Sequence, residues 1–236
     1  MARIILTNDD GIEAPGMGAL FRASEGLGDR VVVAPCGACS GLGHAVTTHE
    51  RIVVERLRES WYSVAGTPAD CARLALGNLA PDAGWVLSGI NRGGNLGADL
   101  YISGTVAAAR EAALLGSRAI AISQYVRPDL ELDWEWTCRI SAEVLRNLLA
   151  RPLSPRSFWN VNLPHLAPGS PDPEVVLCKI DPGPLDVRFR LEGEFNGQPT
   201  FAHFTGNYHR RRQDPGRDVE VCFSGKIAVT EVPLEI

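Results

Sequence analysis

Hydrophobic residues fall into two alternating patterns along the first two thirds of this sequence. Short apolar runs are typical of strands buried on both faces, and apolar residues spaced three or four apart are typical of helices that cover a sheet. Their alternation predicts a mostly parallel sheet with helices on both faces, which is a Rossmann-like three-layer α/β core. The expected strands are 3–7, 30–34, 47–57, 61–64, 85–87 and 119–123, and the expected helices are 15–25, 67–76, 105–115 and 132–149.

The pattern changes after residue 150. Eleven of the sixteen prolines lie beyond that point, and the strand-like runs at 175–180, 187–191 and 227–232 are short and irregular. We therefore expect a core domain over residues 1–165 and a β-rich C-terminal extension over residues 166–236. The extension is expected to serve self-association and not to fold as an independent domain.

Composition narrows the class of protein. The chain has 236 residues, 45% hydrophobic content and a formal net charge of −5, which is enough apolar material for a globular core. No hydrophobic run approaches the roughly 20 residues that cross a bilayer, and no secretory leader is visible, so we expect a cytoplasmic protein without a membrane partner. A net negative chain is also poorly suited to neutralise the phosphates of a nucleic-acid duplex.

The six cysteines are expected to be free thiols, because disulfides are rare in cytosolic proteins of this size. Cys36 and Cys39 have the CxxC spacing of some zinc and redox sites. Such a site needs partners, and the sequence contains no second CxxC and no HxxxH. Chance spacing in a loop is therefore the preferred interpretation.

Acidic residues follow the first predicted strand, where ligands of open parallel sheets bind. Asp9 and Asp10 can converge only where the strand has ended and the chain turns, which Gly11 permits. Two carboxylates about 4 Å apart repel by roughly 4 kcal/mol at an effective dielectric of about 20, and a shared divalent cation reverses that sign. The alternative is a solvated turn that caps the next helix.

A glycine-rich stretch between residues 88 and 105 lies at the end of another predicted strand. Its last residues, Ser103, Gly104 and Thr105, open an alanine-rich helix, and a helix N-terminus offers unpaired N–H donors that suit a phosphate. The stretch is not a Walker loop, because no Gly-Lys-Thr follows. The alternative is a long surface loop with a Ser or Thr helix cap.

Oxygen ligands alone are available near the acidic pair. Asp9, Asp10, Ser40 and Asn91 offer carboxylate, hydroxyl and amide oxygens, a set that favours magnesium, manganese or calcium over zinc. A hard cation beside a helix N-terminus combines a Lewis acid with a phosphate-binding site. That combination indicates phosphoester hydrolysis.

Five ordered motifs and a later segment stand out along the chain. They are Ile-Leu-Thr-Asn-Asp-Asp-Gly-Ile with Ala14-Pro15-Gly16, Ser40-Gly41, Gly66-Thr67-Pro68-Ala69-Asp70-Cys71, Ser88-Gly89-Ile90-Asn91 with Gly94-Asn95-Leu96-Gly97, Ser103-Gly104-Thr105 with the helix that follows, and Asn160-Val161-Asn162-Leu163-Pro164. Together these segments resemble the survival protein E (SurE) 5′-nucleotidases. The resemblance covers most of residues 1–165 and continues weakly to the end.

The resemblance implies a metal-dependent phosphatase that hydrolyses nucleoside 5′-monophosphates. It implies one divalent cation held by Asp9, Asp10, Ser40 and Asn91, and the oxygen ligands make magnesium or manganese the expected ion. As a separate mechanistic hypothesis, Asp9 or Asp10 acts as the general base. The resemblance also implies phosphate contacts from Asn95, Ser103, Gly104 and Thr105. Family members form homodimers and homotetramers through C-terminal extensions that exchange between subunits.

Three further polar positions have a structural and a functional interpretation. His44 is expected to be structural, with contact to a leaving group as the alternative. Asp70 is expected to cap or brace the helix at 67–76 and not to bind metal. The run Arg210-Arg211-Arg212 is expected to be a solvated basic patch, with a polyphosphate site as the alternative.

Two competing functions remain open at this stage. A haloacid-dehalogenase-type phosphatase also has an acidic motif after its first strand, but here Asn8 occupies the nucleophile position and an amide cannot form an aspartyl-phosphate. A non-catalytic nucleotide sensor is possible on the same fold. The acidic pair argues against the sensor, because uncompensated carboxylates repel a phosphate.

Overall fold

A nine-stranded sheet forms the centre of the computed structural model, which describes residues 3–185, 187–193 and 200–234. Its strands are β1 (Arg3–Thr7), β2 (Asp29–Pro35), β3 (Val54–Arg58), β4 (Trp61–Val64), β5 (Ala83–Arg92), β6 (Arg118–Gln124), β7 (Ser157–Leu163), β8 (Val175–Leu177) and β11 (Ile227–Pro233). Their order is β3-β4-β2-β1-β5-β6-β7-β11-β8, and every neighbouring pair is parallel except β3–β4 and β7–β11.

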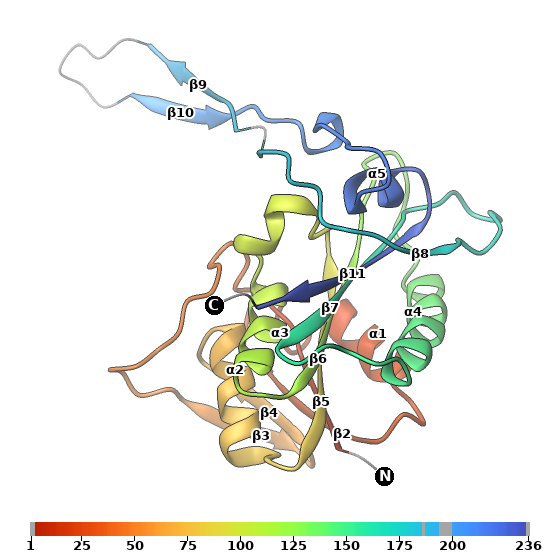
Figure 1. Cartoon of the computed structure of the whole chain (residues 1–236). Helices are drawn as coiled ribbons and strands as arrows, with labels where there is room; N and C mark the ends of the chain where they lie inside the picture. Colours follow the sequence, from red (N-terminus) through yellow and green to blue (C-terminus); the bar gives the residue numbers. More distant parts are fainter. Residues whose placement is uncertain (1–2, 186, 194–199, 235–236) are drawn as a thin grey trace.

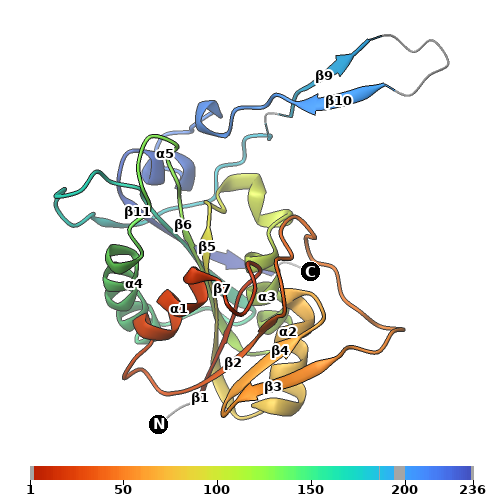
Figure 2. The ribbon, with the colours of Figure 1, turned by 180° about the vertical axis from the view of Figure 1, so that it is seen from behind.

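Helices cover both faces of the sheet, as the alternation predicted (Figures 1 and 2). One face carries α1 (Pro15–Ala23) and α4 (Trp134–Leu149), and the other carries α2 (Pro68–Leu74) and α3 (Gly104–Leu114). Successive apolar side chains of a strand point to opposite faces. Ile4 and Leu6 of β1 therefore belong to the buried cluster that includes α1, and Ile5 belongs to the cluster that α2 and α3 cover. The predicted three-layer α/β core is confirmed.

Several predicted boundaries are wrong. The expected strand at 47–57 begins only at Val54, because the Thr47 amide and hydroxyl both donate to the Asp70 carboxylate at 2.8 Å and not to a neighbouring strand. Strand β5 continues to Arg92, where a loop was expected from residue 88. Helix α2 ends at Leu74 and passes into a π-helical turn, η1 (Ala75–Leu79).

The chain after residue 165 adds strands to the main sheet and also forms a separate hairpin. Strand β11 lies between β7 and β8, so the last described strand is part of the core sheet. A hairpin of β9 (Phe189–Glu192) and β10 (Phe201–Phe204) extends away from the body (Figure 1). The remaining elements are η2 (Gly97–Tyr101), η3 (Tyr208–Arg210) and α5 (Asp218–Phe223).

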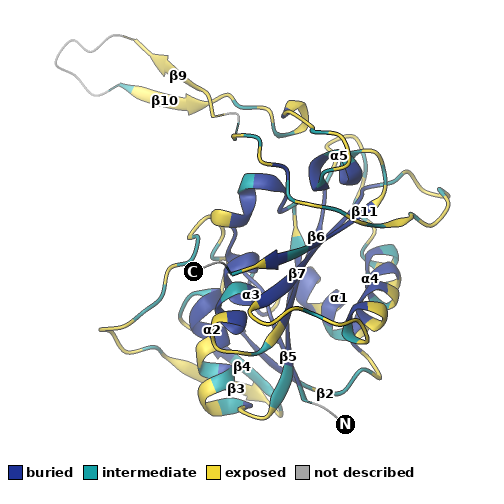
Figure 3. Cartoon of the chain, viewed as in Figure 1, coloured by how far each residue is buried: buried dark blue, intermediate teal, exposed yellow. Residues whose placement is uncertain are grey.

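Burial follows this division. The central strands are buried, whereas β9 and β10 are exposed along their whole length (Figure 3). Within the described ranges, no helix combines the length and apolar character needed to span a bilayer.

Candidate active site

The acidic pair lies at the point where the strand order reverses. From β1 the chain proceeds to β2, β3 and β4 on one side of it, and then to β5, β6 and β7 on the other. Thr7 at the end of β1 is in register with Ser88 of β5, so the turn at Asp9 and Asp10 lies beside the last residues of β5. Open α/β sheets bind ligands at this position.

Asp9 is buried against the first turn of α3. The Thr105 hydroxyl donates to Asp9 Oδ1 at 2.5 Å. A Cβ atom at position 104 would lie 2.8 Å from Asp9 Cβ and 3.0 Å from Asp9 Oδ2, so only glycine fits there without displacing the carboxylate. The structure therefore brings Asp9, Gly104 and Thr105 together, as the motif order suggested.

Asp10 and Asn91 are both bonded to backbone groups at the end of β5. The amide of Arg92 donates to Asp10 Oδ2 at 3.1 Å. The Asn91 side chain donates through Nδ2 to the Gly93 carbonyl at 2.8 Å, which leaves its amide oxygen as a potential ligand.

Ser40 lies in an irregular, largely exposed loop that crosses the same turn. The amide of the preceding residue, Cys39, donates to the Asp9 carbonyl at 2.7 Å and so attaches the loop to the acidic pair. The four predicted metal ligands are thus linked to one turn. Asp9 and Asp10 form it, and Ser40 and Asn91 each adjoin a residue whose amide donates to it.

Negative charge at this turn is not neutralised by a basic side chain of the described residues. Burial raises the pKa of Asp9, and the neighbouring Asp10 carboxylate raises it further, while the Thr105 hydrogen bond opposes both effects. A cation between the two carboxylates would remove this penalty.

A hard divalent cation fits the residues present. The described part of the chain contains no group of three or more His, Cys, Asp or Glu side chains placed to hold a metal. An ion at this turn would therefore need the Ser40 and Asn91 oxygens in addition to the two carboxylates, and such an all-oxygen set suits magnesium or manganese.

The N-terminus of α3 carries the second predicted group. The Ser103 hydroxyl caps the helix by accepting from the Val106 amide at 3.1 Å. The first-turn residues Gly104 and Thr105, and with them the positive end of the helix dipole, lie beside Asp9.

Asn95 is held by a polar network that the sequence did not reveal. Two hydrogen bonds fix its side chain and its backbone. Asn95 Nδ2 donates to Ser123 Oγ at 2.8 Å, and the Asn95 backbone N–H donates to Asn162 Oδ1 at 2.7 Å. Its carbonyl accepts from the side chains of Asn160 and Asn162 at 2.9 and 3.0 Å. The available signal was an Asn-x-Asn pair, whose alternate residues share one face of a strand.

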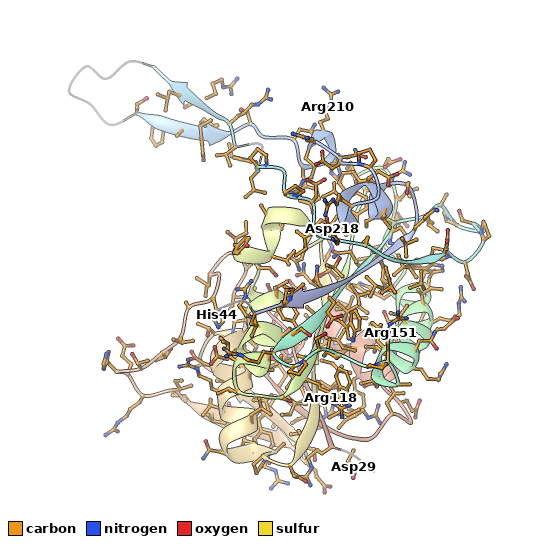
Figure 4. The ribbon with its side chains drawn as sticks, in the orientation of Figure 1. Asp29, His44, Arg118, Arg151, Arg210 and Asp218 are labelled. Carbon is orange, nitrogen blue, oxygen red and sulfur yellow. The ribbon has the colours of Figure 1, made fainter. Side chains whose placement is uncertain are left out.

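Asp70 caps a helix, as expected, and His44 makes a contact that supports the expected structural role, which stays a prediction. Asp70 forms a capping box with Thr67 at the start of α2. His44 Nε2 lies 2.6 Å from Glu111 Oε2, and Glu111 also accepts from Arg73 Nε at 2.6 Å, so His44 joins the loop of Ser40 to α3 (Figure 4).

The prediction of a solvated basic patch at 210–212 is wrong for its central residue, Arg211. Arg210 projects outward (Figure 4), and Arg212 is exposed, whereas Arg211 is buried and pairs with Asp99 at 2.6 Å. The spacing of residues along the sequence could not reveal that Arg211 pairs with Asp99, which lies 112 residues away.

Fold and site together define a Rossmann-like α/β protein with an oxygen-rich, acidic centre beside a helix N-terminus. Residues 4–181 match the family Survival protein SurE, and the chain belongs to that family. This chain is 50% identical to a protein of Nostoc sp. that is provisionally named a 5′-nucleotidase. The match covers 97% of this chain and 98% of the Nostoc protein. The 5′-nucleotidase SurE of Myxococcus xanthus is 38% identical over 99% of this chain and 88% of its own.

Solved structures show the same relationship. The crystal structure of the SurE protein from Aquifex aeolicus has a TM-score of 0.87 and 29% sequence identity to this chain. The match covers 99% of this chain and 94% of the other.

Proposed function

We propose that this protein is a divalent-metal-dependent phosphatase that hydrolyses nucleoside 5′-monophosphates. Asp9, Asp10, Ser40 and Asn91 would hold magnesium or manganese, and such a cation supplies Lewis-acid polarisation and lowers the pKa of bound water. The observation that carries the proposal is the buried, unneutralised Asp9 carboxylate on the first turn of α3. The names of the SurE relatives support the substrate class.

The side chains and backbone of this chain would bind and orient the ester. The Ser103 hydroxyl and the amides of Gly104 and Thr105 would donate to phosphoryl oxygens, because the Ser103 amide already donates to the Asp99 carbonyl at 3.0 Å. Asn95 would also contact the phosphate. One of the two carboxylates, Asp9 or Asp10, would accept the proton of the attacking water, and the nucleoside would leave with its 5′ oxygen. Thr105 would fix the orientation of Asp9 through its hydrogen bond.

A covalent aspartyl-phosphate mechanism has less support. Asn8 is buried and donates through Nδ2 to the Gly11 carbonyl at 2.7 Å, which closes the acidic turn. An amide committed to this turn has neither the charge nor the position of a nucleophile.

Activity should depend completely on a divalent cation. We expect phosphate release from nucleoside 5′-monophosphates in magnesium or manganese, a loss of roughly 100-fold or more after chelation, and recovery on adding the cation back. A colorimetric phosphate assay over 5′- and 3′-monophosphates and both metals measures this. Tight nucleotide binding without turnover would favour the sensor, and a trapped phosphorylated Asp9 or Asp10 would favour the covalent mechanism.

We also propose that residues 166–236 serve self-association as a homodimer or homotetramer, and that the protein works in the cytoplasm. The support for self-association is the β9–β10 hairpin, where Phe189 and Phe204 are paired across the strands yet 59% and 61% exposed. Exposed apolar surface of this kind marks an interaction site.

Removing the two aromatic side chains should therefore lower the oligomeric state. In analytical ultracentrifugation, the double variant Phe189→Ser/Phe204→Ser is expected to sediment as a smaller species than the wild type. The matched control is Val53→Ser, an exposed apolar side chain on the body, which should sediment as the wild type does. Identical sedimentation of the hairpin variant and wild type would contradict the assignment.

A further inference from the structure

Asp99 lies midway between the two segments assigned to phosphate binding, four residues after Asn95 and four residues before Ser103. Its backbone carbonyl accepts from the amides of Ile102 and Ser103 at 3.1 and 3.0 Å. Its carboxylate accepts from the amide of Leu96 at 3.2 Å. Asp99 thus holds the backbone next to Asn95 and the backbone of Ser103 at the same time.

The Asp99 carboxylate is in turn held by the C-terminal part of the chain. Arg211 Nη1 donates to Asp99 Oδ2 at 2.6 Å, and the two side chains are only 6% and 9% exposed. The Tyr208 hydroxyl donates to the same oxygen at 2.9 Å, and the Arg211 guanidinium lies 4.9 Å from the Tyr208 ring centroid. A charge pair so deeply buried persists only when its geometry and hydrogen bonds are well satisfied.

The backbone carbonyls of the two residues on either side of Asn95 are also bonded to these two side chains, one to each. The Tyr208 hydroxyl lies 3.2 Å from the Gly94 carbonyl, and Arg211 Nη2 donates to the Leu96 carbonyl at 3.3 Å. The neighbouring Arg212 makes no comparable contact, because it is exposed and pairs with Asp214. The contacts with Asp99 and Leu96 are therefore made by Arg211 and not by Arg212, its neighbour in the arginine run.

We propose that Arg211, together with Tyr208, is a positioning residue that holds Asn95 and Ser103 at the spacing required to bind a phosphate. The inference rests on the proposed function, because it takes Asn95 and Ser103 as phosphate contacts. A small displacement of binding groups costs a large factor in affinity and rate. Loss of the ion pair should weaken phosphate binding and leave cation binding unaffected, because Arg211 and Tyr208 contact Gly94, Leu96 and Asp99 and none of the predicted metal ligands.

Arg211→Met and its neighbour Arg212→Met form a matched pair for the test. For Arg211→Met we expect both the KM for a nucleoside 5′-monophosphate and the inhibition constant for inorganic phosphate to rise about tenfold. The concentration of manganese that gives half-maximal activity should stay within twofold of the wild type. Arg212→Met should match the wild type in all three constants.

A second variant keeps the test decisive if the single one fails to fold. Arg211→Met leaves a buried carboxylate without its partner, whereas Asp99→Asn/Arg211→Met removes both charges and retains an oxygen that accepts from Leu96 and Tyr208. Circular dichroism establishes that the variant is folded. The folded double variant is expected to show the same rise in KM and in the phosphate inhibition constant.

If a folded Arg211 variant has the wild-type KM and phosphate inhibition constant, the inference is overturned. It is also overturned if Arg212→Met raises these constants as much as Arg211→Met does. Failure of the proposed function is a separate result, because it appears as absence of turnover in the wild type. In that case, calorimetric titration of wild type and Arg211→Met with inorganic phosphate still decides the inference. Equal phosphate affinity, or no binding by the wild type, overturns it.

Discussion

Replacement of Asp9 by asparagine is expected to lower phosphatase turnover by on the order of 100-fold while the fold stays intact. Asparagine keeps an oxygen that accepts from the Thr105 hydroxyl, so the contact with α3 survives. It loses the negative charge that would hold the cation and accept the proton. Steady-state phosphate release in saturating manganese measures the effect.

The same variant should be at least as stable as the wild type in the absence of metal. Burial raises the folded-state pKa of Asp9 above its ordinary value of 3.8, so the folded chain holds this proton more tightly than the unfolded chain. The contribution of Asp9 to stability is therefore present at low pH and is lost as pH rises from 3.8 through the raised pKa. Asparagine carries no such cost at neutral pH, and thermal unfolding in a chelator should give an equal or higher Tm.

Asp29→Asn is the matched control for charge. Asp29 is exposed and begins β2, so it lies at the amino edge of the same sheet, opposite the acidic turn (Figure 4). Its substitution should change neither turnover nor Tm. Near-wild-type turnover of purified Asp9→Asn would contradict the assignment of the acidic turn.

The sequence was informative where local pattern and topology agree. The placement of Asp9 beside Gly104 follows from two predicted strand ends and one predicted helix start, because parallel strands present their carboxyl ends at one edge. Strand β5 shows the opposite case. Its polar residues Asn91 and Arg92 stay in the sheet because they pair with Ser123 and Gln124 of β6 after an irregularity in register, which no local pattern encodes.

Polar residues inside the core were the main source of missed features. Asn160 and Asn162 lie on the fully buried strand β7, and asparagine is ordinarily depleted in strands. They are tolerated there because both donate to the Asn95 carbonyl. Arg211 was missed for a related reason, since its partner Asp99 lies 112 residues away in the sequence. Long-range hydrogen bonds of this kind decide the fine geometry of the site.

Gly16→Ala is expected to destabilise the protein by at least about 3 kcal/mol, through overpacking between two backbones. Gly16 lies in the first turn of α1, where a Cβ atom would stand 2.0 Å from the Ile90 carbonyl oxygen and 3.2 Å from the Trp134 ring. Neither the carbonyl of β5 nor the helix backbone can rotate away, so α1 must separate from the sheet. Ile90 adjoins Asn91, and activity should therefore fall together with stability.

Gly18→Ala separates this overlap from the general effect of adding a methyl group to α1. Gly18 is exposed in the same helix, and a Cβ atom there would meet nothing within 4 Å. Alanine at that position should raise stability by about 0.5–1 kcal/mol, because it loses less conformational entropy than glycine on folding. Urea unfolding monitored by circular dichroism compares the two midpoints at equal m values. Equal midpoints for the two variants would show that α1 does not approach β5 as closely as the structure indicates.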